Sequence, residues 1–140
     1  MEIKRIEPPR EFGVGKRGGT LRHCADVQLD ADEQVTFVAA GGSEHDLVRK
    51  SWGYYATGSL NGRLPEHGLR PVLCIGVPRE GESARRAYLM LVEPEGEPQF
   101  RDYLRGEGME VVCWLDSDAA LTEVAERLAG LQGSARDPGS

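Results

Sequence analysis

The sequence contains no apolar run of the roughly 18–20 residues that a membrane-spanning helix requires. Its first residues also lack the apolar stretch of a signal peptide. From these two absences we expect a cytoplasmic protein with no membrane partner. At 140 residues, of which 39% are hydrophobic and 29% charged, the chain has the size and composition of one ordinary globular domain.

Cysteine is scarce, and the three cysteines lie far apart in the chain. An odd number without a C-x-x-C pair argues against a disulfide framework. Cys24, Cys74 and Cys113 each fall in a predicted strand, where free cysteine commonly serves as a small buried apolar residue. His23 and Cys24 are neighbours on one strand, so their side chains point to opposite faces. With no compact His or Cys spacing, we expect no metal and no other cofactor.

Positive charge is in short supply, because 17 Lys and Arg residues face 23 Asp and Glu residues, for a net charge of −6. This balance argues against broad nucleic-acid binding, which needs a clustered positive surface, and against attachment to a membrane surface. Residues 1–70 are neutral, with ten basic and ten acidic residues, whereas residues 71–140 carry seven and thirteen. The acidity therefore lies in the C-terminal half.

The order of the predicted elements indicates an α+β fold. Alternating or continuous apolar patterns predict six strands, and Gly41-Gly42 suits a hairpin turn between two of them. Two helices follow in the C-terminal half, one that Gly106 is expected to stop and one that begins after Ser117. We expect a mainly antiparallel sheet of about six strands with both helices packed on one face. The predicted strands are 20–29, 34–40, 44–50, 71–77, 86–92 and 109–115, the first helix is 97–105, and the second begins after Ser117 with apolar residues at 121, 124, 125 and 128.

The sequence predicts that the two ends of the chain lie outside the folded domain. Residues 1–19 predict a flexible N-terminal arm, because Pro8-Pro9 blocks a helix and the glycines that follow give no periodic apolar face. Residues 20–132 form the predicted domain. Residues 133–140 have little apolar content and predict a disordered tail.

A glycine-rich stretch, Gly13-Val-Gly-Lys-Arg-Gly18, matches the letters of a dinucleotide-binding motif. That motif needs a buried strand before it and a helix after it, and the sequence predicts neither. We therefore expect no nucleotide site here, although Lys16 and Arg17 among glycines could contact an anion.

The segment 49–63 carries three positive charges and no acid, and three of the nine aromatic residues lie between positions 52 and 55. Its aromatic faces suit a sugar or a base, its hydroxyl and amide groups offer hydrogen bonds, and its cations suit phosphate or carboxylate. Gly53, Gly58 and Gly62 would let the backbone approach a ligand closely. The candidate ligand-binding residues are Arg49, Lys50, Trp52, Tyr54, Tyr55, Thr57, Ser59, Asn61 and Arg63.

A structural interpretation of the same segment is also open. The aromatic residues could cap a sheet edge, and the basic residues could pair with the acidic C-terminal half. Asn61-Gly62 could then simply form a turn.

Residues 50–64, Lys-Ser-Trp-Gly-Tyr-Tyr-Ala-Thr-Gly-Ser-Leu-Asn-Gly-Arg-Leu, resemble a segment of small uncharacterised bacterial proteins linked to surface-glycan biosynthesis. The resemblance implies a sugar-bearing ligand. We therefore expect a small binding or accessory protein that recognises an anionic or sugar-bearing small molecule, or an acidic partner surface, through segment 49–63.

Two other functions remain open. The first is a small enzyme acting on a phosphorylated or sugar-nucleotide-like substrate, with Tyr54, Tyr55 or His45 transferring a proton and Arg63 neutralising charge. No specific catalytic signature supports it. The second is a structural or oligomerising subunit that docks a partner, which could be another copy of the chain, through a strand edge or the last helix.

Overall fold

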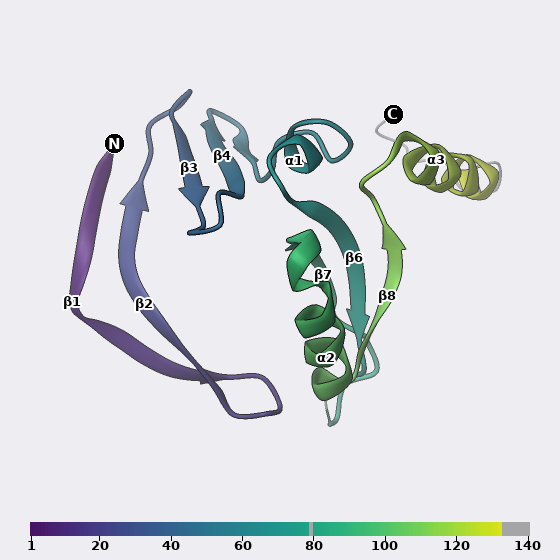
Figure 1. Ribbon diagram of the computed structural model, residues 1–140, viewed down its shortest axis with the longest axis horizontal. Coiled ribbons are helices and arrows are strands. Elements are labelled where there is room, and N and C mark those ends of the chain that lie inside the picture. Colours follow the sequence, from purple (N-terminus) through teal and green to yellow (C-terminus); the bar gives the residue numbers. More distant parts are fainter. Residues whose placement is uncertain (79, 133–140) are drawn as a thin grey trace.

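The computed structural model describes residues 1–78 and 80–132 (Figure 1). The described chain is mixed α and β, with three small antiparallel sheets and its two longer helices in the second half. It has eight strands, so the expected single sheet of about six strands is wrong in both number and arrangement. Paired strands are neighbours in sequence within each sheet, except that the last strand pairs with the sixth after a helical connection.

The first sheet is a long hairpin of β1 (Glu2–Val14) and β2 (Gly19–Gln28). The segment 1–19, for which the sequence predicts a flexible arm, therefore contains a strand that pairs with β2 over residues 2–5 and 10–14. The pairing shifts register between Arg5 and Arg10, which accommodates the two prolines that cannot donate to the ladder. Gly15 and Gly18 have positive φ angles and form the turn.

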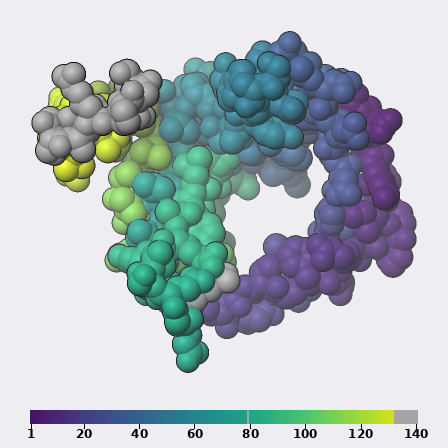
Figure 2. All heavy atoms as spheres, turned by 180° about the vertical axis from the view of Figure 1, so that it is seen from behind, coloured from purple at the N-terminus to yellow at the C-terminus, as the bar shows by residue number. Residues whose placement is uncertain are grey.

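The hairpin curves away from the rest of the chain and returns to it at its tip (Figure 1). There the backbone N–H of Lys16 donates to Glu107 at 2.7 Å, and Arg17 pairs with Asp102 at 3.2 Å. Figure 2 shows the result, an open window between the purple hairpin and the other two sheets. The chain thus closes into a ring without filling its centre.

The second sheet consists of β3 (Gln34–Val38), β4 (Glu44–Lys50) and β5 (Gly53–Tyr55), in that order. The predicted hairpin around Gly41-Gly42 is confirmed, and Gly42 adopts a φ of 95° that suits glycine. A loop and the one-turn helix α1 (Arg63–Glu66) follow β5. This sheet and loop hold the segment 49–63.

The third sheet has β6 (Arg70–Gly76) in the middle, between β7 (Ala87–Val92) and β8 (Met109–Trp114). A 3₁₀ turn (Pro94–Gly96) leads into α2 (Glu97–Glu107), which covers one face of this sheet. Val72, Cys74, Val92 and Leu104 form the buried core there.

The ends of the two longer helices test the expected start and stop signals. Helix α2 ends at Glu107, and Gly108 after it takes the left-handed conformation with φ of 66°, so the predicted stop at Gly106 is wrong by two residues. Helix α3 (Asp118–Gln132) begins as predicted, because the Ser117 hydroxyl accepts the Ala120 N–H at 3.1 Å. None of the described helices is long and apolar enough to cross a membrane.

The three cysteines lie in strands as predicted, but they differ in burial. Cys74 is buried and Cys113 is half-buried. Cys24 is exposed, which corrects the expectation that all three serve as buried apolar residues. The reason is that β2 belongs to a two-stranded hairpin that no other layer covers. The predicted tail 133–140 lies outside the described residues.

Leu104 anchors α2 to the third sheet, and its side chain is only 5% exposed. We expect Leu104→Ala to lower the free energy of unfolding by about 2–4 kcal/mol, because it leaves a cavity in the small core. Urea denaturation followed by circular dichroism measures this change. Arg101→Ala, on the exposed side of the same helix, is the control and should cost about 0.5 kcal/mol or less. Equal losses for the two variants would contradict the assigned core.

Candidate functional site

The β4–β5 hairpin decides which side chains of segment 49–63 share a face. Arg49 pairs with Tyr54 in the register, and Val48 pairs with Tyr55. Because neighbouring residues of a strand point to opposite faces, Tyr54 and Tyr55 lie on different sides of the sheet. The predicted site is therefore divided between two faces.

A small pocket of about 230 Å³ lies on the Tyr55 face. Three of the nine predicted site residues meet there, namely Tyr55, Thr57 and Ser59. Within the described chain, no hydrogen bond involves the hydroxyl groups of Tyr55 or Thr57. The pocket thus offers free hydroxyl groups beside a carboxylate and an amide. Its complete lining is Gln34, Asp46, Val48, Tyr55, Thr57, Gly58 and Ser59.

Two of the three cations of the segment are held in its hairpin. Arg49 donates to the Gly53 carbonyl at 2.9 Å, and its guanidinium lies 5.1 Å from the centre of the Tyr54 ring. Lys50 pairs with Asp32, which raises the pKa of the lysine. Both cations therefore stabilise the β4–β5 hairpin and its approach to the turn before β3.

The third cation, Arg63, ties the loop to the sheet. Its Nε donates to Asp46 at 2.8 Å, and Nη2 lies 3.4 Å from Glu44. The other Asp46 oxygen accepts a hydrogen bond from the Thr36 hydroxyl at 2.6 Å. The Arg63 and Thr36 bonds hold the pKa of Asp46 below its usual value, so this carboxylate stays ionised at neutral pH.

Gly58 and Gly62 make room for side chains of the loop itself. A Cβ on Gly58 would lie 2.7 Å from Arg63 Cγ, and one on Gly62 would lie 2.7 Å from Ser59 Oγ. These glycines therefore permit the Arg63 and Ser59 contacts. Their expected role in bringing the backbone close to a ligand stays a prediction.

The remaining site residues lie outside the pocket. Trp52 is exposed in the β4–β5 turn and contacts Tyr55 edge-on, with 5.4 Å between ring centres. Asn61 donates to Asp118 at 2.6 Å, so it connects the loop to the start of α3. The Trp52–Tyr55 pair borders the pocket through Tyr55, whereas Asn61 binds the first residue of α3.

The partners of the basic residues differ from those that the structural interpretation expected. Lys50 and Arg63 pair with Asp32, Asp46 and Glu44, which all belong to the neutral N-terminal half. Only the uncharged Asn61 among the nine residues pairs with an acid of the C-terminal half, among the bonds that the structure describes. Segment 49–63 is basic in sequence, but in the folded chain nearby carboxylates neutralise the charges of Lys50 and Arg63.

The groups suggested for proton transfer do not meet in this pocket. His45 donates from Nε2 to the Ala56 carbonyl at 2.7 Å, since a carbonyl can only accept. Tyr54, His45 and Arg63 are all outside the pocket lining that contains Tyr55. His23 lies 2.8 Å from Asp26 on the distant hairpin. Among residues 1–78 and 80–132, no three His, Cys, Asp or Glu side chains cluster in a way that could hold a metal ion.

Sequence reasoning missed Asp46 and Gln34, which line the pocket, and Thr36, whose hydroxyl donates to Asp46. The register of the predicted hairpin contained the signal. Once Gly41-Gly42 is taken as the turn, Thr36 lies opposite Asp46 and Gln34 lies opposite Val48. Alternation then places these pairs on the face of Tyr55.

A larger hollow of about 620 Å³ lies between the tip of the β1–β2 hairpin, β7 and α2. Lys16 and Arg86 line it together with Tyr88 and Tyr103. Arg86 pairs with Glu82 at 2.9 Å, whereas the Lys16 ammonium has no hydrogen bond or ion pair within the described chain. The glycine-rich stretch forms a hairpin turn followed by a strand, which agrees with the absence of a dinucleotide-binding context.

Comparison with known proteins finds no matching family, no similar curated protein and no similar solved structure. The resemblance of residues 50–64 to glycan-biosynthesis proteins therefore stays a prediction.

Acid should weaken the fold through Asp46. A carboxyl group with a lowered folded-state pKa stabilises the fold above its unfolded pKa, and this stabilisation is lost as the pH falls through the folded pKa. We expect Asp46→Asn to cost about 1 kcal/mol at pH 7, because Asn accepts weaker hydrogen bonds from Arg63 and Thr36. The difference should shrink as the pH falls below 3.8, the usual value for this group. Urea denaturation of both proteins from pH 7 to pH 2 measures it, and a constant difference would contradict the pairing.

Proposed function

We propose that the chain is a small binding protein whose pocket on the Tyr55 face takes one neutral, hydroxyl-rich ring, such as a sugar residue. The observation that carries this proposal is the meeting of Tyr55, Thr57 and Ser59 in one pocket with the Asp46 carboxylate. A carboxylate accepts hydrogen bonds from ligand hydroxyls, an amide can accept or donate them, and the Tyr55 ring offers an apolar face.

The charges and the size of the pocket narrow the ligand. Lys50 and Arg63 already neutralise internal carboxylates, so a negative ligand would have to compete with Asp32 and Asp46 for them. The volume of about 230 Å³ lies below the roughly 300–1,000 Å³ of pockets for drug-sized ligands. Both observations favour one uncharged ring over a whole sugar nucleotide.

The proposal is tested by titrating the protein with glucose, galactose and N-acetylglucosamine, followed by calorimetry and by NMR of ¹⁵N-labelled protein. We expect saturable binding of at least one sugar, with shifts at residues 55–59. Tyr55→Phe should weaken it about three- to tenfold, the loss of one hydrogen bond of about 1 kcal/mol. Tyr54→Phe, on the opposite face of the same strand, is the matched control and should bind normally. No saturable binding, or equal effects of both variants, would overturn the proposal.

A second candidate function, binding of a small anion, rests on the hollow at the hairpin tip. Lys16 is a cation without a partner in the described chain, and it lies in a hollow of about 620 Å³ beside Arg86 and two tyrosines. A free ammonium binds phosphate or carboxylate without first losing an internal ion pair. The tyrosines provide flat faces for the rest of the ligand.

Glucose 1-phosphate separates the two functions. At the hairpin tip we expect it to bind through its phosphate, so Lys16→Gln should weaken this binding about tenfold, because it removes one charge-assisted hydrogen bond. Lys4→Gln, an exposed lysine on β1, is the matched control. Calorimetry at low salt measures both variants. Unchanged binding of glucose 1-phosphate by Lys16→Gln would overturn the proposed anion site. It would leave the proposal of a sugar pocket unaffected.

A further inference from the structure

The tip of the β1–β2 hairpin forms one wall of the hollow of about 620 Å³. Residues 13–16 line the hollow from the hairpin, whereas Arg86 and Tyr88 line it from the β7 side and Tyr103 lines it from α2. The tip reaches this place at the end of the long curve of the hairpin (Figure 1). The hollow is therefore closed on that side only while the tip lies against α2.

The pairing within the hairpin is interrupted about half-way along. Residues 2–5 and 10–14 of β1 pair with β2, whereas residues 6–9 between them do not. Cys24 alone lies opposite that interval, so β1 carries the excess residues there. Such an excess disrupts the ladder and bends the strand, and β1 bends about half-way along its length (Figure 1). The interruption therefore divides the hairpin into a base next to β3 and an outer arm, residues 10–23.

The base of the hairpin is fixed to the second sheet through the connection from β2 to β3. In this connection the Asp32 N–H donates to the Arg49 carbonyl at 2.8 Å. The Glu33 carbonyl accepts a hydrogen bond from the Arg49 N–H at 2.9 Å. A movement of the outer arm about residues 6–9 therefore displaces the tip and leaves the base in place.

Two polar contacts hold the outer arm in its closed position. Among the hydrogen bonds and ion pairs of residues 1–78 and 80–132, only these two join it to the chain beyond the hairpin. The Lys16 N–H donates to Glu107 at 2.7 Å. Arg17 pairs with Asp102 at 3.2 Å, and the two side chains are 54% and 60% exposed. Ion pairs this exposed contribute little to stability and are screened by salt, so the closed position is held weakly.

The C-terminal end of α2 has room for both cations of the tip. A Cβ on Gly106 would lie 1.8 Å from Arg17 Nε, and one on Gly108 would lie 3.3 Å from Lys16 Nζ. Both cations thus lie close to the last turn of the helix, where the macrodipole favours positive charge. The two glycines therefore allow a close electrostatic contact between the tip and the helix end.

We propose that the outer arm is a lid, which pivots about residues 6–9 and opens and closes the hollow at the hairpin tip. Asp102 and Glu107 are its latch, because they make the contacts that hold it closed. An anion in the hollow favours the closed position, because Lys16 on the lid and Arg86 beside β7 both line the space between them. This effect of the ligand rests on the anion site proposed above, whereas the movement of the lid does not.

The movement is tested by NMR of the ¹⁵N-labelled full chain in increasing sodium chloride. Salt screens the latch, so the amide signals of residues 10–23 should shift together between about 20 and 500 mM salt. The signals of residues 2–5, in the base, should stay in place. Asp102→Asn/Glu107→Gln removes the latch charges. At low salt it should place the outer-arm signals where the unsubstituted chain has them only at high salt.

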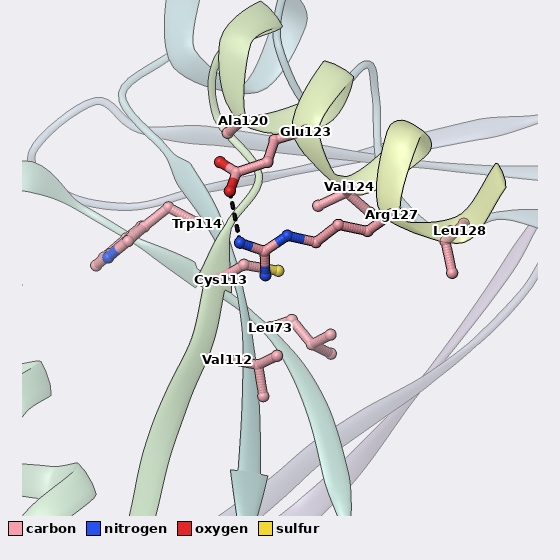
Figure 3. A pocket seen from close by; sticks show the side chains of 9 residues that line it. All are labelled: Leu73, Val112, Cys113, Trp114, Ala120, Glu123, Val124, Arg127 and Leu128. Carbon is pink, nitrogen blue, oxygen red and sulfur yellow. Dashed lines mark hydrogen bonds and ion pairs between the residues drawn. The ribbon is translucent and has the colours of Figure 1, made fainter. Parts of the chain in front are cut away.

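A matched control comes from α3. Glu123 pairs with Arg127 at 2.6 Å (Figure 3), and neither residue lines the hollow at the hairpin tip. Glu123→Gln/Glu126→Gln removes two negative charges, as the latch variant does, and should leave the outer-arm signals unchanged at low salt. Outer-arm signals that do not respond to salt would overturn the lid. So would equal shifts in the base and the outer arm, or equal effects of the latch variant and this control.

Glucose 1-phosphate separates the lid from its ligand. At about 150 mM salt, it should return the outer-arm signals toward their low-salt positions, because it binds Lys16 and closes the lid. Lys16→Gln should lose this return and keep the response to salt. A response to salt without any effect of glucose 1-phosphate would overturn the role of the anion and leave the lid itself established.

Discussion

The ion pair between Arg63 and Asp46 holds the loop after β5 against the middle strand of its sheet. The Asp46 side chain is only 12% exposed, and bonds from Arg63 and Thr36 offset the cost of removing its charge from water. The same contact places Thr57 and Ser59 next to Tyr55, so the polar pocket depends on it. It also engages one of the three cations of segment 49–63 in an internal ion pair.

The apolar side chains are distributed over three sheets, and in the described part of the chain helix α2 packs on the third of these. The buried core there is correspondingly small. The long β1–β2 hairpin touches the rest of the chain at its ends and frames a window (Figure 2). Folding is driven mainly by burial of apolar surface, and this arrangement leaves many large apolar side chains of the described chain exposed.

Local patterns predicted most of the elements. The strand expected at 20–29 is observed at Gly19–Gln28, and the helix expected after Ser117 begins at Asp118. Both depend on alternation or on capping, which act within a few residues. The strand at Glu2–Val14 was missed because Pro8-Pro9 and the glycines mask its alternation, and only pairing with β2 stabilises it. The division into three sheets was missed because strand patterns do not specify which strands pair.

The sequence by itself determined where most of the strands and the two longer helices lie, and it drew attention to segment 49–63 as a concentration of aromatic and basic residues. Only the tertiary structure decided which of these residues meet. Strand pleating divides Tyr54 from Tyr55, and ion pairs with Asp32 and Asp46 neutralise Lys50 and Arg63. The physical reason is range: propensity and capping act between neighbours in sequence, whereas charge pairing and burial act between residues that only folding brings together.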